Sequence, residues 1–173
     1  MTTITDTERA DLLATLAQQR YFLRFTARDL TDDQARQRTT VSELCIGGLI
    51  KHVTSVEQGW VRFILEGPSP RGGVAEMTSE DWERRAAEFR LPPGETLAGV
   101  LAAYDMVARR TDEIVATLPS LNDAWPLPEA PWFPPGESWT ARRVLLHIIS
   151  ETAQHSGHAD IIRESLDGAK TMG

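Results

Sequence analysis

The chain has 173 residues, of which 41% are hydrophobic and 25% are charged, and its formal net charge at pH 7 is −7. These proportions are typical of an ordinary globular protein, and the length suits one domain with a sizeable apolar core. We therefore expect residues 1–173 to form a single domain. The acidic balance argues against nucleic acid as a partner, because phosphate recognition needs a basic stripe.

Cysteine content and the absence of apolar runs indicate a cytoplasmic protein. The chain has one cysteine, Cys45, which excludes an intramolecular disulfide and fits a reducing compartment. The first residues, MTTITDTERADLL, contain neither the basic region nor the apolar region of a secretion signal. No apolar run approaches the roughly 18–20 residues that span a bilayer, so no membrane partner is expected.

Apolar residues recur at helical spacing in four long segments. These segments cover approximately residues 6–30, 42–65, 95–118 and 140–166. The second ends at Gly67 and Pro68, as helices commonly do. The fourth opens at Thr140, a candidate N-cap, and Gly168 follows it as a stop signal. Four helices of this length, with no alternating strand pattern between them, predict an all-α four-helix bundle.

Two short helical pieces and an unusual loop separate the long segments. The pieces are DDQARQR and SEDWERRAAEF, the second with Ser79 as its expected N-cap. The loop PSLNDAWPLPEAPWFPPGES precedes the last helix and is too rigid and apolar to be a disordered linker, so we expect it to pack on the bundle. Its aromatic residues either cap one end of the bundle or form a lid over a pocket: Trp125, Trp132, Phe133 and Trp139.

Ionisable residues are concentrated in the fourth helix, where residues 147–158 read HIISETAQHSGH and hold three of the four histidines. A helix turns about 100° per residue, so His147, Glu151, His155 and His158 fall within an arc of about 80°. Apolar side chains, Ile148 among them, share this sector. The polar stripe therefore lies on the face that should enter the core.

His52 gives the second helix a similar feature. It lies at the margin of an apolar stripe, while Lys51 points to the opposite half of the helix. A buried carboxylate costs several kcal/mol unless it is paired. The buried negative charge of Glu151 can be compensated by a protonated histidine, by an inward-turned arginine or by a divalent metal. Glu151 and His155, four residues apart, can chelate one ion, and His52 from a facing helix completes a set of two histidines and one carboxylate.

The residues alone also allow interpretations without a metal. A lone histidine on an apolar face is often a satisfied core residue, which applies to His52. The Glu–x–x–x–His spacing arises by chance in many helices. His147, near the start of the fourth helix, fits a structural role or a hydrogen bond to Glu151 better than it fits a ligand.

Two segments carry a resemblance to a known family. SELCIGGLIKHVTSVEQGW and WTARRVLLHIISETAQHSGHADIIRESLDG resemble the DinB/YfiT-like metalloenzyme superfamily, in particular its actinobacterial DinB-like branch. This superfamily includes mycothiol-dependent maleylpyruvate isomerase and the bacillithiol and mycothiol S-transferases. The resemblance covers essentially the whole chain. It implies an up-down-down-up four-helix bundle that is commonly a homodimer.

The resemblance also implies a metal site. The expected ion is divalent, zinc or nickel in the first place, with iron and manganese as alternatives. Its ligands map onto His52, Glu151 and His155; many members have histidine at the position of Glu151, whereas isomerase-like members have glutamate. His158 has no fixed role in the family. We assign it as the catalytic candidate that moves a proton, with a fourth metal ligand or a partner of a ligand as alternatives.

The function that the resemblance implies is a metal-dependent enzyme that uses a low-molecular-weight thiol on a small-molecule substrate, as an S-transferase or an isomerase. The chain lacks the additional C-terminal domain of the maleylpyruvate isomerases, which argues against their specific reaction. One alternative is a metal-dependent hydrolase. The other is a non-catalytic, stress-linked bundle in which the metal is structural or absent.

Overall fold

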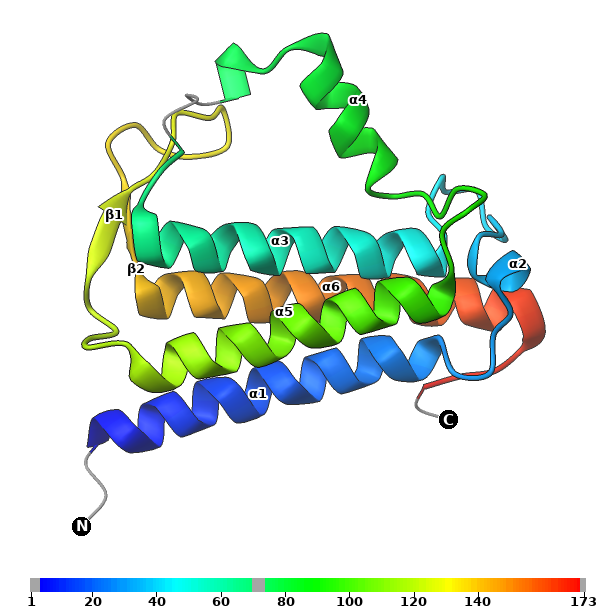
Figure 1. The fold of residues 1–173 in the computed structure, drawn as a ribbon, viewed down its shortest axis with the longest axis horizontal. Coiled ribbons are helices and arrows are strands. Elements are labelled where there is room, and N and C mark those ends of the chain that lie inside the picture. Colours follow the sequence, from blue (N-terminus) through cyan, green and yellow to red (C-terminus); the bar gives the residue numbers. More distant parts are fainter. Residues whose placement is uncertain (1–3, 70–73, 172–173) are drawn as a thin grey trace.

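The computed structural model describes residues 4–69 and 74–171, and it is mainly helical (Figure 1). Its long helices are α1 (Ile4–Thr26), α3 (Ile46–Glu66), α5 (Leu97–Thr117) and α6 (Ala141–Asp167). The shorter elements are α2 (Asp32–Ala35), the 3-10 helix η1 (Val74–Glu76), α4 (Ser79–Ala87), β1 (Ala124–Pro126) and β2 (Ser138–Thr140). The predicted all-α class is confirmed.

The long helices form one antiparallel bundle. α1 and α6 run in one direction and α3 and α5 in the other, which is the up-down-down-up order (Figure 1). α6 packs against α1 and α3, and α5 packs chiefly against α3. The topology that the resemblance implied is therefore confirmed. This arrangement places one side of α3 against α6 and another against α5.

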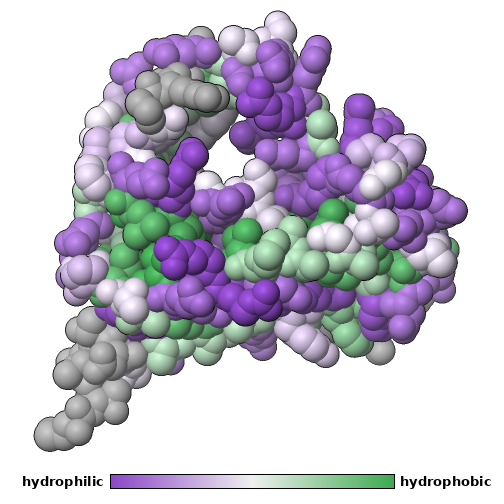
Figure 2. All heavy atoms as spheres, in the orientation of Figure 1, coloured by the Kyte–Doolittle hydropathy of each residue, from purple (hydrophilic) through white to green (hydrophobic). Residues whose placement is uncertain are grey.

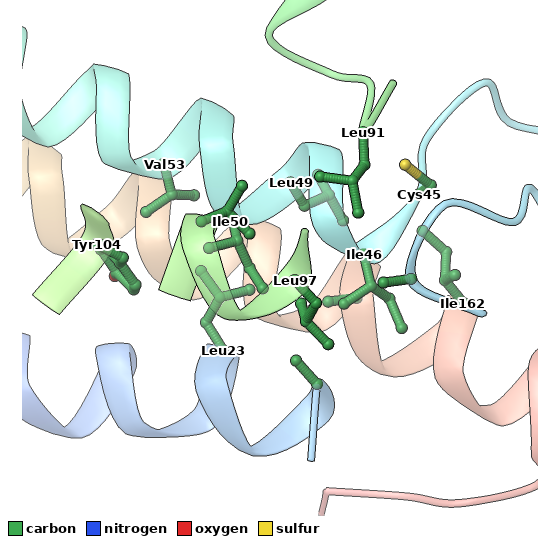
Figure 3. Close-up of a cluster of buried hydrophobic side chains, with 14 residues drawn as sticks. Leu23, Cys45, Ile46, Leu49, Ile50, Val53, Leu91, Leu97, Tyr104 and Ile162 are labelled. Carbon is green, nitrogen blue, oxygen red and sulfur yellow. The ribbon is translucent and has the colours of Figure 1, made fainter. Parts of the chain in front are cut away.

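Two apolar clusters fill the bundle. The first lies near α2, where the ends of α1 and α6 meet the start of α3, and Figure 3 shows Leu23, Ile46, Leu49 and Ile50 pointing toward one another. The second lies toward the hairpin and is made by Leu16, Val61, Val115, Val144, Leu145 and Ile148, among others. Burial of these side chains supplies the main driving force for folding.

Two helices are shorter than the sequence pattern predicted. α1 ends at Thr26 and not near residue 30, and α3 begins at Ile46 and not near residue 42. Before α3, the backbone N–H of Ser42 donates to Thr40 Oγ1 and that of Leu44 donates to Ser42 Oγ, both at 3.2 Å. These hydroxyls offer the backbone an alternative to helical hydrogen bonds, so the helix starts later.

Capping residues set the ends of α6 and the start of α4. As predicted, Thr140 caps α6 with its side chain, and Gly168, with a left-handed φ of 78°, ends it. The N-cap of α4 is Thr78 and not Ser79, so that prediction was wrong by one residue. The reason is reciprocal bonding: Asp81 N–H donates to Thr78 Oγ1, and the Asp81 carboxylate accepts from Thr78 N–H.

The Pro- and Trp-rich loop folds onto the bundle, as predicted, but through a small hairpin that the sequence did not indicate. β1 and β2 pair antiparallel with Trp125 opposite Trp139. The Trp125 indole donates to the Ile64 carbonyl at 3.1 Å, and Trp139 is buried in the second cluster. Strands of three residues carry too little alternation to be recognised by pattern.

α4 stands off from the bundle above α3 (Figure 1). None of its described side chains is buried, and Figure 2 shows an opening between α4 and the helices below it. The chain returns to the bundle through residues 88–96, which cross the outer face of α3 at Gly48. Among the described residues, no helix is both long enough and apolar enough to cross a membrane.

Candidate metal centre

Three potential metal ligands from two helices meet where α3 packs against α6. His52 comes from α3, and Glu151 and His155 lie one turn apart on α6. One ligand atom of each residue lies within 4.8 Å of the other two. The structure thus brings together the residues that the sequence singled out as a candidate set.

The donor set and its spacing fit a divalent cation. Bonds from zinc to nitrogen or oxygen of about 2.0–2.2 Å place two tetrahedral ligands roughly 3.4 Å apart, so a spread of 4.8 Å is closed by modest side-chain rotation. The side chains of His52 and His155 are 7% and 12% exposed, and that of Glu151 is 27% exposed. The group is therefore held by the bundle on one side and accessible from the other.

The charge state of Glu151 suits a cation. His155 Nε2 lies 3.7 Å from Glu151 Oε2, and His147 Nε2 lies 4.0 Å from Oε1. The interaction with His155 is the largest influence and lowers the pKa of Glu151; burial opposes it, and the nearby His147, His155 and His52 lower it further. The carboxylate therefore remains ionised at neutral pH, the form that binds metal.

His147 extends the polar row beyond the ligands. Burial lowers its pKa, the charge of Glu151 opposes that shift, and Arg143 adds to it. The imidazole is therefore neutral near pH 7 and able to accept a proton. Its ring contacts Trp60 and Trp139, with centroids 4.9 and 5.1 Å away.

His158 contacts a candidate ligand. Its Nδ1 lies 3.4 Å from Nδ1 of His155, whose Nε2 faces Glu151. His158 is not among the residues of the described chain whose ligand atoms converge. The contact favours the alternative in which His158 is the partner of a ligand, and its catalytic role stays a prediction.

Glu88 is a neighbour of the site that the sequence did not identify. Its Oε2 lies 3.4 Å from His52 Nδ1, and its Oε1 accepts a hydrogen bond from Ser55 Oγ at 2.8 Å. Burial raises the pKa of Glu88, but the bonds from His52 and Ser55 and the charge of Arg85 outweigh it and hold the pKa below its usual value. Glu88 lies 36 residues from His52, so no local spacing could reveal the contact.

The aromatic residues of the loop divide into two groups. Phe133 and Trp139 join Trp60 beside His147, with Trp60 and Trp139 stacked at 5.1 Å. The Trp125 ring packs over Gly67 at the end of α3. Phe133 and Trp139 thus lie near the candidate ligands and Trp125 covers the end of α3, while Trp132 is largely exposed next to Phe133; a lid over a pocket stays a prediction.

Two arginines near the start of α6 and the cysteine have structural partners. Arg142 is engaged by Glu8 and by Asn122. The Arg143 guanidinium lies 4.8 Å from the centre of the Trp139 ring. Cys45 is buried in the first cluster.

Comparisons with known proteins identify related chains. A family model described as mycothiol-S-transferase matches residues 11–168. A crystal structure of a conserved protein from Enterococcus faecalis is similar in fold, with a TM-score of 0.66 and 15% sequence identity, and the match covers 98% of this chain and 100% of that one. At that identity the likeness concerns the fold alone. No curated protein matches the chain.

Proposed function

Because this chain belongs to the mycothiol S-transferase family, we propose that it joins mycothiol, or a closely related thiol, through its sulfur to a small electrophilic substrate with the help of a divalent metal. One observation carries the proposal: His52, Glu151 and His155 bring a ligand atom each within 4.8 Å of the others.

The two histidines and the carboxylate would hold the cation, zinc or nickel in the first place. A site with three protein ligands leaves a position open for a small molecule. A cation held by these residues would supply a positive charge that lowers the pKa of a nearby thiol and so favours the thiolate near neutral pH. Glu151 contributes a negative charge that is present at neutral pH, because its pKa is lowered.

His147 is suited to take up the proton that the thiol loses. Its lowered pKa keeps the ring neutral, and its side chain is 26% exposed, so it can release that proton to water. The sulfur then uses one electron pair to form a bond to the electrophilic carbon, while the leaving group departs with the electron pair of its own bond. His158 would support this chemistry through His155, which it contacts.

An aromatic wall beside His147 suits an apolar electrophile. Trp60, Phe133 and Trp139 contact one another and lie on the side of Glu151 that His147 occupies. Flat or apolar substrates gain binding free energy from such rings. We therefore expect apolar electrophiles to be better substrates than charged ones.

Thiol conjugation tests the proposal. Metal-loaded protein is mixed with mycothiol and monochlorobimane, and formation of the fluorescent conjugate is followed with and without a chelator. We expect conjugation that the chelator abolishes and that is faster with mycothiol than with glutathione. The exposed variant Arg110→Ala should match the wild type. No conjugation above background would contradict the proposal, and turnover without any thiol would favour a hydrolase.

The homodimer that the family resemblance implies is part of the proposal. Light scattering on the purified protein should give about twice the chain mass of 19.2 kDa. A chain that stays monomeric would remove this part of the proposal and leave the chemistry untouched.

A further inference from the structure

Glu88 joins the end of α4 to the metal-facing part of α3. One carboxylate oxygen lies 3.4 Å from His52 Nδ1, and the other accepts from Ser55 Oγ at 2.8 Å. With both oxygens engaged, the carboxylate has a fixed orientation relative to α3. Neither contact involves Glu151 or His155, so Glu88 acts on the site through His52 alone.

The contacts of His52 leave one ring nitrogen free to bind a metal. Nδ1 faces Glu88, so a neutral ring that donates from Nδ1 has its lone pair on Nε2. The ring is stacked on Phe89, with centroids 4.1 Å apart, and meets the ring of His155 nearly at right angles at 4.9 Å. These contacts fix the plane of the ring and leave Nε2 as the ligand atom.

Glu88 and Phe89 reach His52 because the segment after α4 passes very close to the backbone of α3. A Cβ atom on Gly48 would lie only 2.0 Å from the Phe89 carbonyl oxygen, and one on Gly47 would lie 2.7 Å from the Leu91 side chain. Only glycine lets the segment after α4 approach α3 this closely. The position of Glu88 is therefore built into the fold.

We propose that Glu88 is the positioning residue of the metal site, which holds His52 in the Nδ1–H tautomer so that Nε2 is directed at the cation. Histidine ligands commonly donate their second ring N–H to a carboxylate, and loss of such a partner typically costs 10–100-fold in metal affinity. The proposal rests on the metal site proposed above. It assigns to the end of α4 a function that the exposure of this helix does not suggest.

Metal affinity is the first test. Competition with a chromophoric chelator gives the zinc affinity of the wild type, Glu88→Ala and Glu83→Ala, the last being an exposed carboxylate on α4. We expect affinity lower by about 10–100-fold in Glu88→Ala and unchanged in Glu83→Ala. Equal zinc affinities in all three proteins would overturn the role of Glu88 but not the metal site. If none of the three binds zinc, the metal site itself is overturned.

Nitrogen NMR of the metal-free wild type is the second test and does not depend on a well-folded variant. Long-range couplings of the His52 ring distinguish the two neutral tautomers. The geometry requires Nδ1–H in the wild type, and a ring protonated on Nε2 would overturn the proposal. The amide of Glu88→Gln has one oxygen and can therefore accept from only one of the two donors, His52 or Ser55. We expect its zinc affinity to lie between that of Glu88→Ala and that of the wild type.

A cavity of about 510 Å³ lies between α3 and α5. It is open because α5 presents Gly99 and Ala103, one turn apart, opposite the polar side chains Thr54 and Gln58 of α3. Its volume lies within the range of small-molecule sites, about 300–1,000 Å³. Glu88 lines it as well, so a residue that contacts His52 also faces the cavity.

The cavity has a largely apolar lining with several polar groups, which could bind the C–H surfaces and the hydroxyl groups of one ligand. Lys51 and Glu95 form an ion pair at 2.7 Å on one wall and offer both donors and acceptors. Thr54 donates its hydroxyl hydrogen to the Ile50 carbonyl, which leaves its oxygen free to accept. Val100 and Ala103 supply an apolar surface for the C–H face of a sugar ring.

We infer that this cavity binds the hydroxyl-rich glucosamine–inositol part of mycothiol while its cysteine reaches past Glu88 to the metal, an inference that rests on the proposed function. Calorimetry on metal-loaded protein compares mycothiol with N-acetylcysteine, which lacks the sugar. Ala103→Leu fills the cavity and should weaken mycothiol binding at least about tenfold while leaving N-acetylcysteine unaffected. Ala102→Leu, on the exposed face of α5, is the matched control.

The outcomes separate the two levels of the proposal. Mycothiol that binds the wild type and Ala103→Leu equally would overturn the cavity as its site and leave the transferase proposal standing. Failure of both thiols to bind the metal-loaded wild type would overturn the transferase proposal itself. A loss that affects both thiols alike in Ala103→Leu would also contradict the cavity assignment.

Discussion

Glu57 is a carboxylate in the interior of the bundle, and Arg20 is its partner. The exposed fractions of the two residues are 0% and 2%. Arg20 Nε donates to Glu57 Oε2 at 3.1 Å, a second guanidinium nitrogen donates to Oε1, and a third donates to Asp112 Oδ1 at 2.8 Å. Such a pair is costly to break, because the remaining charge stays buried without compensation.

Removal of the Glu57 carboxylate should therefore destabilise the protein strongly. In urea unfolding we expect Glu57→Leu to lower the free energy of unfolding by about 3–5 kcal/mol, since Arg20 is left charged in the core. Asp112→Asn should cost less than about 1 kcal/mol, because the Asp112 side chain is 47% exposed. Equal losses in the two variants would contradict this account of the pair.

Asp167 gives a residue-level prediction about pH. The hydrogen bond from Arg163 is the largest influence and lowers the pKa of this carboxyl below its usual value of 3.8. A lowered pKa in the folded state means that the stabilisation is fully present well above pH 3.8 and is lost as the pH falls through the folded pKa. Asp167→Asn should thus be less stable than the wild type near neutral pH, and the difference should shrink in acid. A constant difference at all pH values would contradict the linkage.

At the scale of elements, two glycines of α3 have opposite surroundings. Gly48 lies beneath the segment that follows α4, where a Cβ would meet the Phe89 backbone. Gly59 lies three turns later on an exposed part of the helix, where a Cβ would meet nothing within 4 Å. The same substitution therefore probes a helix crossing at one position and helix propensity at the other.

Gly48→Ala and Gly59→Ala should change stability in opposite directions. We expect Gly48→Ala to lower the free energy of unfolding by about 1–3 kcal/mol through overpacking, and to weaken metal binding because the displaced segment carries Glu88. Gly59→Ala should raise it by about 0.5–1 kcal/mol, since alanine has the higher helix propensity. Urea midpoints and zinc titrations measure both effects. A neutral Gly48→Ala would mean that the crossing is not as close as described.

On the scale of the whole molecule, periodicity was sufficient to predict the bundle but not its finer features. Four long segments with helical spacing became α1, α3, α5 and α6, and the row of His147, Glu151 and His155 followed from rotation along one helix. That His52 faces this row was expected from its apolar stripe and from the family resemblance. The end of α1 and the start of α3 were predicted less accurately. Before α3, hydrogen bonds to local hydroxyls compete with the helix.

Features that depend on distant parts of the chain could not be predicted. The pair of Arg20 and Glu57 joins residues 37 positions apart, and its burial depends on the rotation of α1 against α3. Glu88 reaches His52 only because the chain turns back across Gly48 after an exposed helix. Neither contact leaves a periodic signal in the sequence, so each required the three-dimensional arrangement of the bundle.

The metal content of the purified protein tests the central claim most directly. Wild-type protein prepared without a metal-affinity tag, dialysed against zinc and then against buffer, is analysed beside His52→Ala, Glu151→Ala, His155→Ala and the control Lys51→Ala. We expect about one zinc per chain in the wild type and in Lys51→Ala, and little in the other three variants. A wild type without bound zinc or nickel, or variants that retain it, would contradict the account.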